Sequence, residues 1–246
     1  MTAGPDIAES PSPNQNERAL PVSIVVLHYT GMLSAEAARK RLCDPEAEVS
    51  AHYLIEEDGQ IWRLVPENRR AWHAGRGYWR GVRDVNSASI GIELANPGHE
   101  HGYAAFPEAQ IEALTRLLPD ILERHGVAPE NVIGHSDLAP DRKDDPGEKF
   151  PWETLAKRGQ AEARPHAGGD DIWDDPHWSD VGTMRALGRF GYEADQPERA
   201  VTAFQRRWRP DRVDGTIDAE TRTILLALLS RRSAGALRLG THLPRP

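Results

Sequence analysis

The chain alternates short apolar, β-branched runs with a long amphipathic stretch, and this alternation constrains its fold more than any other feature. Residues 22–29 (VSIVVLHY) and 89–95 (SIGIELA) have the composition of buried strands. Residues 107–125 carry Ile and Leu at helical spacing, with Pro107 at the start and Gly126 just past the end. Strands interleaved with helices predict an α/β domain whose mixed central sheet is flanked by helices.

Shorter segments fit the same domain. Ser34 precedes a predicted helix that ends at Leu42, and residues 132–134 predict another buried strand. Residues 51–56 and 60–66 flank an Asp-Gly pair, which is typical of a β-hairpin.

The composition changes to Gly, Ala, Pro, His and Asp between Arg158 and Asp175, which is typical of a linker. Three helical stretches near 180–190, 197–208 and 218–230 then predict a small all-α three-helix C-terminal domain. We therefore expect a disordered tail over 1–20, the α/β domain over 21–160, a linker over 161–175, the helical domain over 176–232 and a tail over 233–246.

Charge and composition exclude several functional classes. A net charge of −8 argues against a nucleic-acid partner, which needs a basic surface. The single cysteine, Cys43, excludes an intramolecular disulfide and a multi-cysteine metal site. The sequence contains no run of about 18 apolar residues, so we expect no membrane-spanning helix. The polar N-terminus lacks the pattern of a signal peptide. We expect a cytoplasmic monomer, or a periplasmic one if an export signal is missing from this sequence.

Two histidines stand out because each follows a predicted strand. His28 and His135 end their runs, and Asp145 lies on a turn shortly after the second histidine. Two imidazoles and a carboxylate match a catalytic zinc site that keeps one position open. A strand-end histidine is more often an ordinary core or surface residue, however, and spacing alone does not bring these three side chains together.

Glu93 lies inside the apolar run SIGIEL, where an unpaired carboxylate is costly to bury. Strand alternation leaves two interpretations open. Either the side chain faces solvent, or its pKa is raised for proton transfer.

Six segments carry a family resemblance, and they follow one another in a fixed order between Pro21 and Leu155. They read VLHYT, VSAHYLIEEDGQIWRLVPE, AWHAG, SIGIELAN, GHSDLAP and RKDDPGEKFPW. Together they closely resemble the type 2 N-acetylmuramoyl-L-alanine amidases. This resemblance implies hydrolysis of the amide between N-acetylmuramic (or anhydromuramic) acid and L-alanine, with peptidoglycan or muropeptides as partners, in cell-wall turnover or recycling.

The resemblance also implies roles for matching residues. His28, His135 and Asp145 match zinc ligands, Glu93 matches the base that shuttles a proton from water to the leaving amine, and Lys143 matches the cation that stabilises the oxyanion. The chemistry is consistent, because Zn²⁺ lowers the pKa of bound water to about 7 and a cation offsets developing negative charge.

Further matching positions imply substrate contacts. His52, Tyr53, Trp72 and His73 fall in segments that line the family's substrate groove, although buried aromatic residues are more often core. Where relatives carry an arginine that binds a stem-peptide carboxylate, this chain has Asp84.

The C-terminal domain resembles the three-helix peptidoglycan-binding module through LGRFGY, AVTAFQRRW and VDGTIDAETRTILLALL. A glycan groove near Tyr192, Phe204 and Trp208 is one interpretation, and a generic helical appendage is the other.

Two other functions stay open for the whole chain. One is a peptidoglycan-recognition protein without activity, although such relatives usually lack a metal ligand. The other is a zinc peptidase that cuts within the stem peptide.

Overall fold

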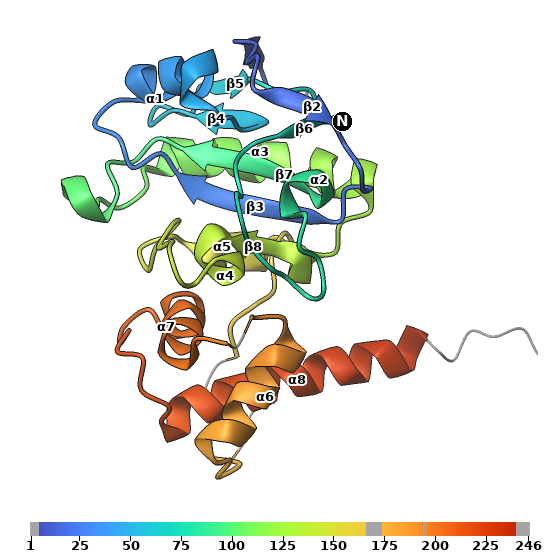
Figure 1. Ribbon diagram of the computed structural model, residues 1–246. Helices are drawn as coiled ribbons and strands as arrows, with labels where there is room; N and C mark the ends of the chain where they lie inside the picture. The colour runs from blue at the N-terminus through green and yellow to red at the C-terminus, as the bar shows by residue number, and fades with distance from the viewer. Residues whose placement is uncertain (1–4, 166–173, 194, 240–246) are drawn as a thin grey trace, which may run out of the picture. The chain divides into compact units, whose positions relative to one another are not determined.

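The structure is a computed structural model that describes residues 5–165, 174–193 and 195–239 (Figure 1). The chain forms two compact units, Met1–Ala163 and Arg164–Pro246. The boundary falls inside the predicted linker over 161–175, of which residues 166–173 lie outside the described residues.

The first unit combines strands and helices. Its strands are β1 (Ile7–Glu9), β2 (Gln15–Glu17), β3 (Ile24–Tyr29), β4 (Tyr53–Ile55), β5 (Ile61–Arg63), β6 (Arg69–Ala71), β7 (Ser89–Leu94) and β8 (Val132–Gly134). Its helices are α1 (Ala35–Leu42), α2 (Val85–Ala88), α3 (Glu108–His125), α4 (His135–Leu138) and α5 (Trp152–Lys157), with 3₁₀ turns at Pro45–Ala47, His99–His101 and Pro129–Asn131.

The central sheet has the strand order β1-β5-β4-β7-β3-β8. Only the predicted hairpin pair, β4 with β5, is antiparallel, and the other neighbours in this sheet are parallel. The predicted α/β class with a mixed sheet flanked by helices is therefore confirmed.

Strand alternation divides the sheet into an apolar face and a functional face. Leu27 and Ile92 pack with the long helix α3 in the main hydrophobic core. The neighbouring positions in β3 and β7 therefore point to the opposite face, and the two strands align His28 directly with Glu93. Helix α1 packs on this second face through Leu42, which contacts Leu54 of β4.

The prediction of a disordered tail over 1–20 is wrong for residues 5–20. Strand β1 pairs with β5, and β2 pairs with β6 in a separate two-stranded sheet. Asn14 donates from Nδ2 to the carbonyls of Asp44 and Val49, both at 2.8 Å. The Asn14 side chain thereby satisfies backbone groups of a distant segment. A polar composition that is typical of disorder therefore belongs to an ordered segment here.

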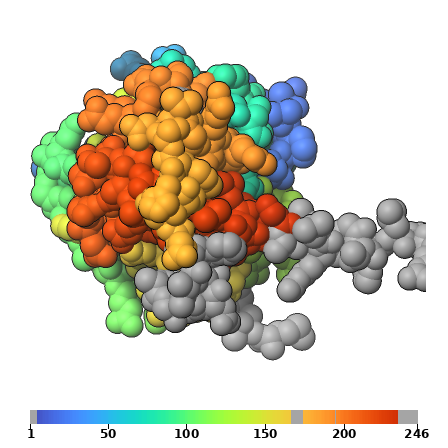
Figure 2. Space-filling model, turned by 90° about the horizontal axis from the view of Figure 1, so that it is seen from below, coloured from blue at the N-terminus to red at the C-terminus, as the bar shows by residue number. Residues whose placement is uncertain are grey.

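The second unit consists of α6 (Asp180–Phe190), α7 (Pro197–Trp208) and α8 (Ala219–Leu239), and Figure 2 shows α6 crossing α8. The predicted three-helix composition matches these elements, but α8 continues through 233–239, where a tail was expected. Tyr192, Phe204 and Trp208 are at most 2% exposed, so they form the core of this unit and not an open groove.

Among the described residues, no helix combines the length and apolarity needed to cross a membrane.

Candidate metal centre and active site

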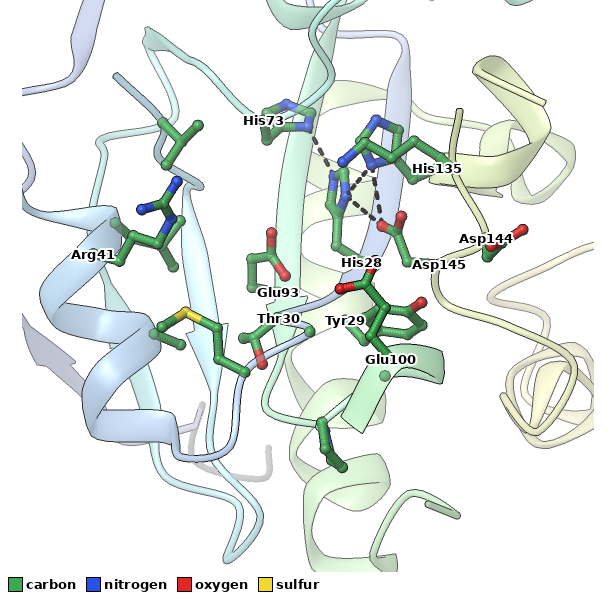
Figure 3. Close-up of a pocket in the computed structure, with 18 of the residues that line it drawn as sticks. His28, Tyr29, Thr30, Arg41, His73, Glu93, Glu100, His135, Asp144 and Asp145 are labelled. Atoms are coloured by element: carbon green, nitrogen blue, oxygen red, sulfur yellow. Dashed lines mark hydrogen bonds and ion pairs between the residues drawn. The ribbon is translucent and has the colours of Figure 1, made fainter. Parts of the chain in front are cut away.

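Three predicted ligands converge on the functional face of the first unit (Figure 3). His28 is the penultimate residue of β3, His135 begins α4 directly after β8, and Asp145 lies in the following loop. His28 Nδ1 is 2.9 Å from both His135 Nδ1 and Asp145 Oδ2, and the last two atoms are 3.1 Å apart. All three residues are at most 5% exposed. The structure thus brings together residues that lie up to 117 positions apart.

Hydrogen bonds at the far side of each ring fix which nitrogen carries the proton. His135 Nε2 lies 3.0 Å from the carbonyl of Ala74, which can only accept, so Nε2 is the donor. In the same way Ser89 donates its hydroxyl to the carbonyl of Val85, which leaves Ser89 Oγ to accept from His73 Nε2.

This chain of donors continues to the metal centre. Because His73 donates from Nε2, its Nδ1 is an acceptor, and His28 Nε2 donates to it at 3.0 Å. The Nδ1 atoms of His28 and His135 therefore both present lone pairs towards the carboxylate of Asp145. Three buried acceptors facing one another repel, and a shared cation is the partner that satisfies them all.

The charges of these groups also suit a cation. Burial opposes ionisation of Asp145, but the neighbouring His135 and His28 outweigh it and hold the pKa of this carboxyl well below its usual range. Burial, followed by the charge of His135, lowers the pKa of His28 to about 4. A neutral imidazole and an ionised carboxylate are the forms that bind metals. Ligands of a tetrahedral zinc stand about 3.3 Å apart, close to the spacing found here.

Glu93 lies beside this centre without belonging to its ligand set (Figure 3). Its Oε2 atom is buried, and no hydrogen-bond partner for it exists among the described residues. Burial, followed by repulsion from Asp145, raises the pKa of Glu93 to about 8, although the ammonium of Lys143 opposes the shift. Of the two interpretations left open by the sequence, the structure supports a carboxyl group with a raised pKa.

A cavity of about 380 Å³ opens over the centre, and its walls contain catalytic and substrate candidates alike. Among the predicted residues it is lined by His28, Trp72, His73, Glu93, His135, Lys143 and Asp145. The concave shape and the few convergent polar groups are those of a small-molecule site.

Two of the predicted substrate contacts lie away from this cavity. His52 is fully buried and accepts at Nδ1 from the backbone N–H of Gly91 at 2.9 Å. Tyr53 is 3% exposed and donates its hydroxyl to Glu67 at 2.7 Å. Both side chains hold the sheet and its neighbouring loop together, which explains their place in a family segment without substrate contact.

Trp72 and His73 line the cavity, and His73 also accepts the hydrogen bond from His28. Its ring lies so close to Gly91 that a Cβ there would stand 2.4 Å from it, so β7 needs glycine at this point. The ring thereby reaches the hydrogen bond with His28 described above. Asp84 is not at the cavity: it caps α2 and pairs with Arg70 at 3.2 Å.

Sequence reasoning missed two supporting residues. The Asn86 side chain accepts from the backbone N–H groups of His73 and Ala74, at 3.0 and 2.8 Å. It thereby positions the His73 ring, which bonds to His28, and the Ala74 carbonyl, which bonds to His135. Tyr103 donates its hydroxyl to the carbonyl of Pro146 at 2.7 Å and steadies the loop next to Asp145. Neither residue carries a local signal, because each acts on a segment that is distant in the sequence.

Comparisons with known proteins agree with this geometry. Residues 18–148 match the family described as N-acetylmuramoyl-L-alanine amidase. The chain is 38% identical over 241 residues to the N-acetylmuramoyl-L-alanine amidase AmiD of Escherichia coli, covering 88% of this chain and 86% of AmiD.

Solved structures extend the likeness to both units. The complex of E. coli AmiD with anhydro-N-acetylmuramic acid-L-Ala-D-γ-Glu-L-Lys superimposes with a TM-score of 0.78 at 36% identity, over 88% of this chain and 92% of that one. AmpDh3 from Pseudomonas aeruginosa gives a TM-score of 0.77 at 33% identity, over 86% and 92%. The chain belongs to the N-acetylmuramoyl-L-alanine amidase family, and the predicted enzyme class is confirmed.

Proposed function

We propose that this protein is a zinc-dependent amidase that hydrolyses the bond between the lactyl group of N-acetylmuramic or anhydromuramic acid and L-alanine. The observation that carries the proposal is the buried set of three acceptors, His28 Nδ1, His135 Nδ1 and Asp145 Oδ2. Beside it lies Glu93, whose Oε2 has no hydrogen-bond partner among the described residues. The substrate class is supported by the family and by the muropeptide named in the AmiD complex.

His28, His135 and Asp145 would hold the zinc ion. When bound, zinc supplies Lewis acidity, which makes water nucleophilic near neutral pH and polarises the scissile carbonyl. With these three residues as its only protein ligands, the ion would keep one position open for the reacting groups.

Glu93 serves as the proton shuttle. Its carboxylate takes a proton from the attacking water and returns it to the amine of L-alanine as the C–N bond breaks. The products are a muramic carboxylate and a stem peptide with a free amino terminus. A pKa raised by burial makes this carboxyl a stronger base than an exposed glutamate.

Lys143 provides the positive charge for the developing oxyanion. Its ammonium interacts electrostatically with Glu93 and with His28, so it acts at the reaction centre itself. No ion pair or hydrogen bond holds this ammonium among the described residues, which leaves it available to the carbonyl oxygen.

Digestion of purified muropeptides followed by mass spectrometry tests the proposal. The expected products are free stem peptides that begin with L-alanine. Binding of muropeptides without any cleavage would instead support a recognition protein, and cleavage inside the stem peptide would make the chain a peptidase.

We also propose that the second unit binds peptidoglycan strands. The support is a cavity of about 750 Å³ between α6 and α7, lined by apolar residues such as Val181, Met184 and Val201. Val181, which lines this cavity, is 63% exposed, so the cavity presents an apolar side chain to solvent. This surface is distinct from the core residues that the sequence suggested.

A further inference from the structure

Charged side chains line the cavity over the metal centre on both sides. Figure 3 shows Arg41 of α1 on the opposite side of the cavity from Asp145, while Glu100 and Asp144 stand on the side of the metal ligands. A ligand that fills the cavity therefore meets one cation at the α1 wall, Arg41, and a separate cation, Lys143, at the reaction centre. Such an arrangement selects the orientation of a charged substrate.

Helix α1 directs Arg41 towards the cavity. Ala38, Arg41 and Leu42 all line it, as expected for positions i, i+3 and i+4 on one helical face. The two preceding basic residues point elsewhere: the guanidinium of Arg39 lies over the Trp62 ring, and Lys40 pairs with Glu36 at 2.7 Å. A general role in neutralising the C-terminal helix dipole is shared by all three basic residues, so it does not explain why one faces the cavity.

Arg41 is also the arginine of the cavity whose guanidinium stays available. Within the part of the chain that the structure describes, no hydrogen bond or ion pair engages this group. Arg142, the other arginine of the lining, donates to the carbonyls of Ala74 and Arg76. Lys143 lies at the reaction centre and interacts with Glu93.

The substrate proposed above supplies a matching group. In a stem peptide that continues through the γ-carboxyl of D-glutamate, the α-carboxylate of that residue stays free, and it lies only two residues from the scissile amide. The last residue contributes a second, terminal carboxylate. A planar guanidinium binds a carboxylate through two parallel hydrogen bonds, which an ammonium cannot do.

We propose that Arg41 is a specificity-determining residue that binds a carboxylate of the stem peptide and orients the peptide across the cavity. This inference rests on the proposed function for the identity of the substrate. Because neither carboxylate takes part in the bond that breaks, Arg41 contributes to substrate binding and leaves the chemical step itself to Glu93 and Lys143.

Binding measured by calorimetry on the full chain with zinc tests this inference, in a Glu93→Gln background that slows turnover by about 10²–10⁴-fold. The probes are anhydromuramoyl-L-Ala-D-γ-Glu-L-Lys and two analogues, one with an α-carboxamide on glutamate and one with a C-terminal carboxamide. Arg41→Ala is expected to raise the Kd of the parent ligand about tenfold, the worth of one charge-assisted interaction. Arg41→Lys should recover part of this loss.

The analogue that lacks the carboxylate bound by Arg41 should have the same Kd for the protein with and without the Arg41→Ala substitution. This equality identifies which carboxylate Arg41 binds. Lys40→Ala is the matched control, since it removes the same charge from the same helix without touching the cavity, and it should leave all three Kd values unchanged. An equal loss on all three ligands, or no loss on any, would overturn the inference.

These outcomes are separate from the test of the proposed function. Cleavage by the wild-type enzyme with no Arg41-dependent difference in Kd refutes only the role of Arg41. Conversely, a carboxylate-dependent Kd in a protein that cleaves nothing refutes the amidase and leaves the Arg41 contact in place.

Discussion

Replacing Glu93 with glutamine separates proton transfer from metal binding and from folding. Glutamine keeps the shape of the side chain but cannot take a proton from water. Since general-base catalysis contributes about 10²–10⁴-fold to rate, we expect kcat/KM to fall by that factor. The zinc content should stay at one per chain, because Glu93 is not among the three ligands.

The same variant should change stability in a pH-dependent way. In the metal-free folded protein the pKa of Glu93 is raised from 4.5 to about 8, chiefly by burial. Between these values the folded state binds a proton that the unfolded state has lost, so the free energy of unfolding falls as pH rises. Each pKa unit corresponds to about 1.4 kcal/mol. After the cost of burying an amide, we expect Glu93→Gln to be more stable than wild type by about 1–3 kcal/mol at pH 8 and equal to it near pH 4.

Denaturant unfolding of both proteins in a chelator, at pH 4, 6 and 8, measures this difference. A difference in the free energy of unfolding that widens towards pH 8 supports a buried carboxyl group with a raised pKa. Parallel pH profiles, or hydrolysis within tenfold of wild type, would refute the reasoning. A bound divalent cation favours the ionised carboxylate, so the working pKa of the zinc enzyme lies below that of the metal-free protein.

Further predictions concern the metal and the second unit. Asp145→Ala should weaken zinc affinity by more than about 100-fold, beyond the effect of losing an outer partner; competition with a chelator measures it, and unchanged affinity would remove Asp145 from the ligand set. His73→Phe breaks the bond to His28 Nε2 and should weaken zinc affinity about 10–100-fold, whereas an unchanged value would leave His73 without a positioning role. A chain ending at Arg164 should keep its hydrolysis of soluble muropeptides but pellet less with intact sacculi. Equal pelleting of both forms would contradict binding by the helical unit.

Much of the fold is readable from local patterns. The helix over 107–125 corresponds to α3 at Glu108–His125, and its stop at Gly126 has the expected left-handed backbone with φ of 63°. The Asp-Gly pair at 58–59 joins the antiparallel β4 and β5 as predicted. These elements are specified by side chains within a few positions of one another, which is why periodicity and turn chemistry find them.

Other features depend on distant partners and escape such patterns. Strands β1 and β2 are only three residues long, which is too short for a periodic pattern, and they form by pairing with β5 and β6. The ligand set followed from the family resemblance, since spacing alone did not join His28 to Asp145. Arg41 resembles an ordinary basic residue at a helix end until the cavity is seen. The cytoplasmic location and the monomeric state stay predictions.

Metal dependence of peptide release tests the central claim most directly. The enzyme is assayed on a muropeptide as purified, after removal of metal by a chelator, and after resupply of stoichiometric zinc. The account predicts that stem peptide beginning with L-alanine is released, that release stops on chelation, and that zinc restores it. Undiminished release from protein shown by elemental analysis to be free of metal would contradict the assignment of His28, His135 and Asp145 as a catalytic zinc site.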